Sequence, residues 1–313
     1  MPLPDLPVRP VLPQVASALA AGAPVVLQAP PGTGKTLLTA PYLLQNAPWL
    51  EGRSIVLLEP RRLAARLAAQ SMARLFNESP GGTVGYQVRL ERAIGPRTRI
   101  EVLTEGLLTR RLLADQALSD VGLVIFDEFH ERSLNADLGL ALALDSRAIL
   151  RPDLRILVMS ATLDAAATAR ILGDDAKVVS AEARMWPVDT ILSPRPLTPQ
   201  GIPDGVAEAV LHALPSTRGG ILAFLPGEAE IRRAASLLRA ASLRRQAKLR
   251  PLYGALAKDE QDMAVAPAPP GVLKVVLATS IAEYSLTIPD ISTVIDCGWS
   301  RVSRFSAASG MSR

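Results

Sequence analysis

Short apolar segments alternate with longer segments of helical periodicity along this chain, from about residue 25 onward. In the first half the apolar segments are 25–29, 54–60, 99–104, 121–128 and 154–162. Continuous apolar runs of this length are typical of strands that are buried on both faces. Such strands, separated by crossover helices, indicate an α/β fold with a parallel, doubly wound sheet.

The segments between these strands repeat apolar residues every three or four positions, which predicts helices over 35–45, 62–76, 106–114 and 136–150. The pattern pauses near 173–190 and then starts again. Further strands are expected at 219–227, 248–254, 273–280 and 291–298, with a helix at 227–243. We therefore expect two α/β units in series, a first domain at 1–173 and a second at 191–313, joined by a linker at 174–190.

The composition narrows the class of protein without identifying it. Nearly half of the 313 residues are hydrophobic, so each unit can bury a core. The net charge of +4 is compatible with a polyanionic partner but does not establish one. The single cysteine, Cys297, excludes a disulfide framework within the chain and a cysteine-rich zinc site.

Two further observations concern the compartment. The N-terminus lacks the apolar core of a signal peptide, and no apolar run reaches membrane-spanning length. We therefore expect a soluble, cytoplasmic protein without a membrane partner.

The segment APPGTGKT at 29–36 follows the first predicted strand and opens the first predicted helix. In that context the pattern G-x-x-x-x-G-K-[ST] indicates a loop that binds nucleotide phosphates, although Ala29 stands in place of the first glycine. Gly32 and Gly34, on either side of Thr33, allow the backbone to wrap an anion with its N–H groups. A glycine-containing turn before an ordinary helix is the alternative.

Two side chains complete this loop. Lys35, the only lysine before Lys177, would reach the terminal phosphates as a mobile point charge. Thr36 would supply a hydroxyl to Mg²⁺. The sequence therefore predicts a nucleoside triphosphate site at the start of this helix.

The segment LVIFDEFHERS at 123–133 places acidic residues at the end of an apolar strand. In enzymes with a phosphate loop, an acid at the tip of a neighbouring strand holds Mg²⁺ through water, and a second one polarises the attacking water. Asp127 and Glu128 match these positions at the carboxyl edge of the predicted sheet. An acidic cap on the following segment is the other interpretation.

The motif DEFHERS closely resembles the second motif of DEAH-box ATP-dependent helicases, with Phe129 in place of the alanine. Further motifs resemble that family in the same order along nearly the whole chain: 59–66, 84–91, 104–112, 160–164, 221–231, 251–256 and 278–288. The residues around this motif look most like those of the bacterial HrpB-type branch of the family. The resemblance implies two tandem RecA-like phosphate-loop domains and the use of ATP.

The resemblance also implies roles for individual residues at the nucleotide. Lys35 and Thr36 would bind phosphate and Mg²⁺, Asp127 would hold Mg²⁺ through water, and Glu128 would activate the hydrolytic water. His130 would couple this site to the second domain, or else is a structural histidine at a strand end.

Other residues resemble family positions that link the nucleotide to movement on a strand. Ser160 and Thr162 match the motif that couples hydrolysis to movement, and could equally satisfy backbone groups at a strand end. Arg61, Arg62 and Thr104 match positions that touch the backbone of single-stranded RNA or DNA.

Contact of that kind is sequence-independent and requires donors to phosphate. For the two arginines, a solvated helix N-terminus is the alternative. In the second domain, Thr279 resembles a residue that faces both the nucleic acid and the nucleotide.

The chain also departs from the family. In the fifth motif Ser280 replaces asparagine and Tyr284 replaces threonine. The sixth motif, which carries arginine fingers in the family, is absent before Arg313, so the second domain is expected to be incomplete and the chain truncated. Arginine fingers raise the rate of comparable reactions about 10³-fold or more. The sequence therefore predicts nucleotide binding more firmly than ATP turnover.

Three functions remain open at this point. The first is an ATP-dependent nucleic-acid helicase of the DEAH type. The second is a catalytically impaired module that binds nucleotide and nucleic acid, and the third is an unrelated phosphate-loop motor, which the order of the motifs disfavours. Protein partners and the choice between RNA and DNA cannot be read from the sequence.

Overall fold

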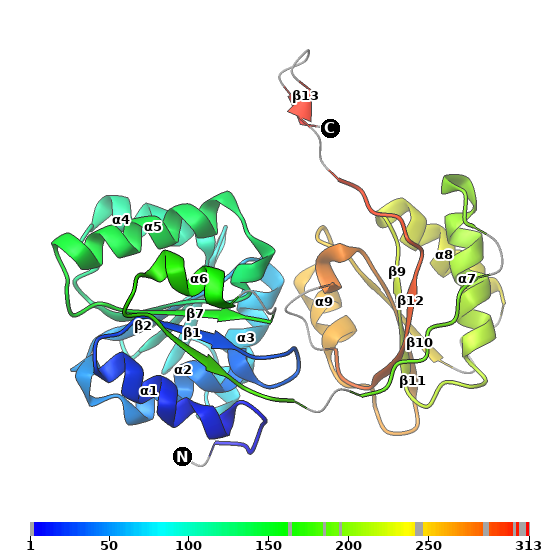
Figure 1. Ribbon diagram of the computed structural model, residues 1–313. Helices are drawn as coiled ribbons and strands as arrows, with labels where there is room; N and C mark the ends of the chain where they lie inside the picture. The colour runs from blue at the N-terminus through cyan, green and yellow to red at the C-terminus, as the bar shows by residue number, and fades with distance from the viewer. Residues whose placement is uncertain are drawn as a thin grey trace. The chain divides into compact units, whose positions relative to one another are not determined.

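The computed structural model describes residues 3–161, 165–183, 186–193, 196–241, 247–283 and 288–302, together with the backbone of 305–306 and 311–312. The chain forms two compact units, Met1–Pro187 and Val188–Arg313, each with its own sheet and helices (Figure 1). Within the described ranges, no helix is long and apolar enough to cross a membrane.

The first unit is built on an eight-stranded sheet with the order β4-β3-β5-β2-β6-β7-β1-β8. Its strands are β1 (Val25–Gln28), β2 (Ser54–Glu59), β3 (Val84–Val88), β4 (Glu91–Ala93), β5 (Ile100–Thr104), β6 (Val121–Phe126), β7 (Arg155–Ser160) and β8 (Lys177–Ser180). All neighbours are parallel except the hairpin of β3 and β4. The expected parallel, doubly wound sheet is therefore confirmed.

Helices cover both faces of this sheet (Figure 1). They are α1 (Leu12–Ala20), α2 (Lys35–Asn46), α3 (Arg62–Leu75), α4 (Glu105–Ala114), α5 (Leu134–Ile149) and α6 (Ala165–Leu172), with short 3-10 turns at Arg9–Val11, Pro48–Leu50 and Phe129–Glu131. Helices α1 to α3 share one core with one face of the central strands. Helices α4 to α6 share the second core with the opposite face.

Alternation along the central strands explains their continuous apolar runs. In β6, Leu123 and Ile125 belong to the core under α1 to α3, whereas Val124 and Phe126 belong to the core under α4 to α6. Successive side chains point to opposite faces, so a strand covered on both sides must be apolar at every position. Polar residues can then appear only where the strand ends.

Several elements differ from the expectations. The predicted strands over 121–128 and 154–162 are shorter, and end at Phe126 and Ser160. The hairpin of β3 and β4 and helix α1 had not been predicted as elements. Strand β8 pairs with β1, so the first unit extends past the boundary expected at residue 173. The assignment of residues 174–190 as a linker stays a prediction.

The second unit contains a four-stranded parallel sheet with the order β10-β11-β9-β12. Its described elements are α7 (Ile202–Ala213), β9 (Gly220–Phe224), α8 (Glu228–Ala240), β10 (Ala247–Leu252), α9 (Lys258–Val265), β11 (Leu273–Ala278) and β12 (Ile291–Asp296), with 3-10 turns at Pro199–Gly201 and Ser280–Ala282. A separate two-stranded hairpin joins β13 (Phe305–Ser306) to β14 (Met311–Ser312).

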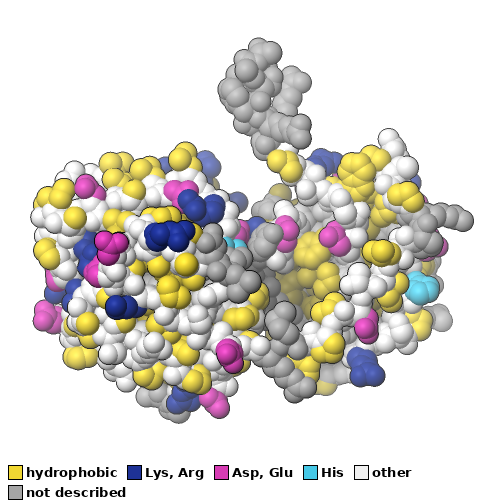
Figure 2. Space-filling view, viewed as in Figure 1, with side chains coloured by type: hydrophobic (Ala, Val, Ile, Leu, Met, Phe, Trp, Pro, Cys, Tyr) yellow, Lys and Arg dark blue, Asp and Glu magenta, His cyan; other side chains and the backbone are white. Residues whose placement is uncertain are grey.

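Helices α7 and α8 pack on one face of this smaller sheet and form its core. Strand β12 is an edge strand in which half-buried and exposed residues alternate, and Val294 is 60 % exposed. Other apolar side chains on this unit are also in contact with solvent (Figure 2). The edge strand therefore has the alternating burial that a strand covered on one side shows.

Candidate functional site

The loop between β1 and α2 requires its two glycines. Gly32 and Gly34 have φ values of 77° and 84°, a region that side chains other than glycine rarely adopt. A Cβ at Gly34 would also lie 2.5 Å from Leu6 Cδ1. Thr33 is buried, and its hydroxyl donates to the carbonyl of Pro30 at 2.8 Å, which ties the loop to itself.

Helix α2 begins directly after this loop, so its N-terminal N–H groups lie at the carboxyl end of strand β1. The first-turn N–H groups of a helix lack acceptors within the helix and favour an anion. The loop and the helix together have a geometry that favours an anion, and phosphate binding at this place stays a prediction.

Lys35 and Thr36 meet the two acids that follow β6. The Lys35 ammonium lies 2.9 Å from Glu128 Oε1, and both side chains are less than a tenth exposed. The Thr36 hydroxyl donates to Asp127 Oδ2. Residues more than ninety positions apart in the sequence thus form one compact polar cluster.

The backbone around Asp127 and Glu128 fixes both carboxylates. The Asp127 N–H donates to the carbonyl of Leu58 in the neighbouring β2, at 3.0 Å. Asp127 Oδ1 accepts from the Glu128 N–H at 2.8 Å. Glu128 itself has a φ of 49°, which is unusual for a residue other than glycine. Strained backbone of this kind is concentrated at functional sites.

The charged groups in this cluster shift one another's pKa values. Burial, followed by the nearby Glu128, raises the pKa of Asp127 to about 6. Burial by itself would lower the pKa of Lys35, but the attraction of Asp127 and Glu128 outweighs it and the pKa is raised. Lys35 is therefore a firmly held cation that neutralises part of an acidic site.

A third acid, Glu59, belongs to this cluster and was missed by the sequence analysis. It is the last residue of β2, next to the end of β6, and is fully buried. Burial, and then the charges of Asp127 and Glu128, raise its pKa well above the ordinary value. The signal that could have found it is an acid at the end of an apolar strand, as at Asp127.

As a carboxylate, Glu59 would have both oxygens buried without a donor. As a neutral acid it can donate to Asp127, and this hydrogen bond accompanies its raised pKa. We favour the neutral form because two ionised carboxylates cannot hydrogen-bond to each other.

Phe129 has a packing role in the turn that follows the two acids. It is buried in the core under α4 to α6, edge-on to Phe126 with ring centroids 6.1 Å apart. The Arg132 guanidinium lies 5.3 Å from its ring centre. Phe129, which stands in place of the alanine of the DEAH motif, thus anchors the turn that carries Glu128 and His130.

His130 lies between the acids and the end of β7. Its Nδ1 is 3.3 Å from Glu128 Oε2 and 3.4 Å from the backbone N–H of Ala161. One nitrogen cannot donate to the carboxylate and accept from the N–H at once, so the two contacts require different positions of the imidazole proton. In either state His130 connects Glu128 with the segment after β7. Its coupling to the second unit stays a prediction.

Arg61 and Glu131 form an ion pair that sequence reasoning did not anticipate. Arg61 Nη2 lies 3.2 Å from Glu131 Oε2, and both side chains are mostly buried. Arg62 is the exposed first residue of α3, and Thr104 is the last residue of β5. All of these predicted nucleic-acid contacts lie at the carboxyl ends of neighbouring strands.

Three further predicted residues have different outcomes. Ser160 ends β7, and its carbonyl accepts from the N–H of Ala29, which joins this strand to the phosphate loop at 2.9 Å. Thr279 lies in the second unit directly after β11. Thr162, like Tyr284 of the fifth motif, falls outside the described residues.

The oxygen donors that could hold a metal ion are the Thr36 hydroxyl and the Asp127 carboxylate, which already contact each other. Across the described ranges, no group of three or more His, Cys, Asp or Glu side chains is arranged so that it could hold a metal ion by itself. This donor set fits Mg²⁺, which is usually held by one or two protein oxygens plus water and substrate phosphates.

Comparison with known proteins agrees with this geometry. Residues 9–171 match the family model of the DEAD/DEAH box helicases, and residues 206–306 match the helicase conserved C-terminal domain. The chain is 49 % identical to ATP-dependent RNA helicase HrpB of Escherichia coli over 99 % of its own length and 38 % of that protein. It is 34 % identical to ATP-dependent RNA helicase HrpA of Borreliella burgdorferi, covering 90 % of this chain and 34 % of that one.

Solved structures show the same relation. A crystal structure of the E. coli DEAH/RHA helicase HrpB superposes with a TM-score of 0.89 at 48 % identity, over 99 % of this chain and 39 % of that one. A second HrpB crystal structure gives a TM-score of 0.77 at 47 % identity, over 100 % and 38 % of the two chains. The two units are thus RecA-like helicase domains, and the chain belongs to the DEAD/DEAH box helicase family.

Proposed function

We propose that this chain is the motor portion of an ATP-dependent helicase, which couples ATP hydrolysis to movement on single-stranded nucleic acid. Relatives named as ATP-dependent RNA helicases favour RNA over DNA as the substrate. The chain spans less than two fifths of the length of those two relatives, so the proposal concerns the motor and not the remainder of such proteins.

One observation carries this proposal. Lys35 of the phosphate loop pairs with Glu128, and Thr36 bonds to Asp127 at the adjacent strand end. A buried ion pair is costly to desolvate and adds little to stability by itself. Its position at the carboxyl edge of a parallel sheet, beside a helix N-terminus, is where nucleotide phosphates bind.

The contacts suggest how the residues act in the reaction. Lys35 would exchange Glu128 for the terminal phosphates of ATP, because a polyphosphate offers more negative charge than one carboxylate. Glu128, released from Lys35, would accept a proton from the attacking water. Thr36 and Asp127 would hold Mg²⁺, Asp127 through water. Mg²⁺, when bound, neutralises negative charge on the phosphate oxygens.

The nucleic-acid part of the proposal rests on residues at the carboxyl ends of neighbouring strands of the same sheet. Arg61 and Arg62 begin α3 after β2, and Thr104 ends the neighbouring β5. These donors would hold backbone phosphates of a single strand. Thr279 of the second unit would face the strand as well, and Ser160, Thr162 and His130 would transmit the state of the nucleotide.

The test is steady-state ATP hydrolysis by the 313-residue chain, with and without single-stranded RNA, beside the Lys35→Ala variant. We expect turnover that RNA stimulates and that the variant loses. Nucleotide binding without turnover would support the second candidate, a binding module without useful catalysis. A chain that binds neither ATP nor RNA would overturn both.

A further inference from the structure

Glu59 is a buried acid of the polar cluster at the phosphate loop, and it has no part in the reaction proposed above. It is the last residue of β2, and it is fully buried. Within the described ranges, no donor forms a hydrogen bond with either of its carboxyl oxygens. Burying a carboxyl group without a hydrogen bond is costly, so the stability of the fold does not explain an acid at this position.

The strand register places Glu59 and Asp127 on the same face of the sheet. Leu57 of β2 and Ile125 of β6 both lie in the core under α1 to α3, and successive side chains of a strand alternate between faces. Glu59 follows Leu57 by two positions, and Asp127 follows Ile125 by two. The Asp127 N–H also donates to the carbonyl of Leu58 in β2, which continues the pairing of the two strands. The two carboxyl groups are therefore neighbours on the face that α2 covers.

The donors of this cluster are engaged with other acids. The Thr36 hydroxyl and the Lys35 ammonium donate to the two acids that follow β6. Thr104, the register partner of Glu59 in β5, forms no hydrogen bond with it. A neutral Glu59 can donate its own hydroxyl to Asp127, but its carbonyl oxygen still has no donor among the described residues. An ionised Glu59 has none for either oxygen, so the missing donor does not depend on the protonation state.

A water molecule bound to Mg²⁺ beside Asp127 would supply the missing donor. The Thr36 hydroxyl and the Asp127 carboxylate are the protein oxygens proposed for Mg²⁺, which usually keeps several of its waters when a protein binds it. The charge of the ion makes the O–H groups of these waters strong donors, and an acidic oxygen is a strong acceptor for them. Glu59 is the acid next to Asp127 on this face, so its unpaired oxygen is suited to accept from such a water.

The contacts of the cluster explain how water can reach a buried acid. Thr36 contacts Asp127 directly, and an ion held by both side chains requires them to separate. Lys35, whose charge also acts on Glu59, would turn to the phosphates of the nucleotide as proposed above. Both changes open the space beside Asp127, which is the neighbour of Glu59. The burial of Glu59 therefore belongs to the closed arrangement of the cluster and is compatible with water around a bound ion.

We propose that Glu59 is a positioning residue of the metal site, which accepts a hydrogen bond from a water molecule bound to Mg²⁺ and so keeps the ion beside Asp127. The proposal rests on the proposed function and adds a third acid to the group that holds the ion. Glu59 touches neither the ion nor the nucleotide, and acts through the bound water and Asp127. Its removal should therefore weaken binding of the metal ion, whereas an acid with a purely structural role would affect folding alone.

The first experiment measures binding of Mn²⁺ to the chain with ADP, from the loss of the EPR signal of free Mn²⁺. ADP is kept below the concentration of the chain, and Mn²⁺ replaces Mg²⁺ because both ions suit carboxylate, hydroxyl and water ligands. Glu59→Met removes both carboxyl oxygens and keeps a side chain of similar length. The Kd for Mn²⁺ should rise about 10-fold or more in this variant, as is usual when a group behind a metal ligand is lost.

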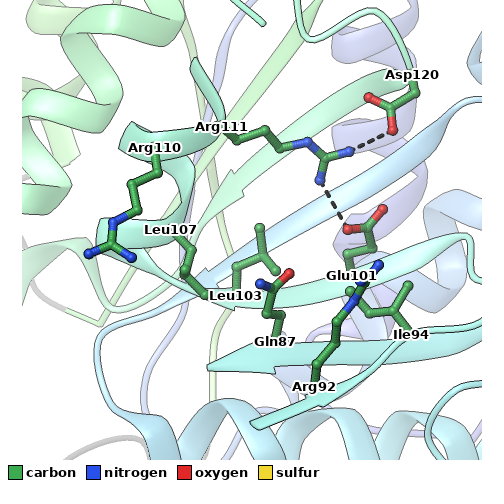
Figure 3. A pocket seen from close by; sticks show the side chains of 9 residues that line it. All are labelled: Gln87, Arg92, Ile94, Glu101, Leu103, Leu107, Arg110, Arg111 and Asp120. Atoms are coloured by element: carbon green, nitrogen blue, oxygen red, sulfur yellow. Dashed lines mark hydrogen bonds and ion pairs between the residues drawn. The ribbon is translucent and has the colours of Figure 1, made fainter. Parts of the chain in front are cut away.

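Two further variants make the result specific. Glu59→Gln keeps a carbonyl acceptor and an N–H donor at the same place, so it should restore most of the affinity for Mn²⁺. The matched control is Glu101→Met in the neighbouring β5, where Glu101 pairs with Arg111 at 3.0 Å (Figure 3). This control should leave the Kd for Mn²⁺ unchanged. Equal weakening in Glu59→Gln and Glu59→Met would mean that charge alone attracts the ion, and would overturn the hydrogen-bonding role.

Binding of fluorescent ADP in EDTA separates a local loss at the metal site from damage to the nucleotide site. Without a metal ion, Glu59→Met should bind ADP as tightly as the unaltered chain, because Glu59 is not part of the phosphate loop. Loss of this metal-free binding in a folded variant would show that Glu59 supports the loop itself, and would overturn the assignment to the ion. Unchanged affinity for Mn²⁺ in Glu59→Met would overturn it as well, but would leave the proposed function standing.

The second experiment uses the unaltered chain and decides the question even if Glu59→Met fails to fold. In a crystal structure with ADP and Mg²⁺, we expect a water bound to the ion at about 2.5–3.0 Å from a carboxyl oxygen of Glu59. Glu59 in contact with Asp127 alone, or bound directly to the ion, would overturn the proposed role. An unaltered chain that binds neither ADP nor Mn²⁺ would overturn the proposed function, and this role with it.

Discussion

The two units of this chain share one architecture but treat buried charge differently. In the first unit the ends of the central strands carry Glu59, Asp127 and Glu128, all buried, with Lys35 facing them. Among the described residues of the second unit, Lys274 is the one buried charged side chain. It donates to the carbonyl of Ala266 at 2.6 Å and so holds the connection that follows α9.

The comparison separates two uses of a buried charge. The buried lysine of the second unit donates to a backbone carbonyl and holds a loop in place. This is a structural role that needs no ligand. In the first unit, burial and then the neighbouring acids raise the pKa of Glu59 and Asp127, although Lys35 acts in the opposite direction. As a carboxylate, Glu59 would have no donor for either oxygen. Such an arrangement is costly for folding and indicates chemistry.

The largest effect should come from removing the proposed base. Glu128→Gln keeps the shape of the side chain but cannot accept a proton, so we expect kcat for ATP hydrolysis to fall by about 10²–10⁴-fold. Nucleotide binding should persist, because the variant also releases Lys35. Steady-state turnover and binding of a fluorescent ATP analogue measure the two quantities.

The control for this variant is Glu208→Gln, an exposed acid on α7 of the second unit. It changes the net charge equally and should hydrolyse ATP like the unaltered chain. Normal turnover in the Glu128→Gln variant would show that another group activates the water. It would contradict the catalytic role that we assign to this buried acid of the first unit.

The buried lysine of the second unit should affect stability and not nucleotide binding. Lys274→Met leaves the Ala266 carbonyl without its donor, which should cost about 1–3 kcal/mol of unfolding free energy. Lys248 lies beside Lys274 in the sheet register but is exposed, so Lys248→Met should change stability by less than about 0.5 kcal/mol. Urea unfolding measures both.

A measurable loss of ATP affinity in the Lys274→Met variant would contradict this distinction. The corresponding substitution in the first unit, Lys35→Met, should abolish ATP affinity. Fluorescent-nucleotide titration of the three lysine variants compares the two units directly.

A smaller effect is expected at the ion pair of Arg61 with Glu131. Glu131→Gln releases Arg61 for a backbone phosphate, so single-stranded RNA should bind about two- to fivefold more tightly, as expected from the strength of a partly exposed pair. Asp137→Asn is the matched control, since it removes the same charge from the nearby pair with Arg132. Equal tightening in both variants would make the effect one of general electrostatics.

The smallest effect concerns an ion pair far from the site. Asp153 bonds to Arg151 and Arg53, and these contacts hold its pKa well below the ordinary value. Its side chain is nearly half exposed, so solvent screening limits the contribution to less than about 1 kcal/mol. Asp153→Asn should therefore lower the free energy of unfolding only slightly at neutral pH.

The depressed pKa also sets the pH dependence. The stabilisation is fully present above the pKa of the unfolded carboxyl, near 4, and is lost as the pH falls towards the folded pKa. The difference between the unaltered chain and Asp153→Asn should be constant from pH 7 to 5 and shrink below pH 4. Urea unfolding at several pH values tests this, and a difference that grows in acid would contradict it.

The sequence by itself was sufficient for the local features. The apolar runs predicted the buried strands because a strand covered on both faces has no polar position, and β1, β2, β6 and β7 follow that rule. The phosphate loop was predictable because its glycines, lysine and threonine are contiguous. The acids after β6 were predictable because a charge at the end of an apolar run is rare.

Only the tertiary structure decided which of these ends meet. Glu59 joins the acids because β2 is the neighbour of β6, and Arg61 meets Glu131 for the same reason. Contacts of this kind depend on strand order and on long-range packing, and a pattern of a few residues along one segment contains neither.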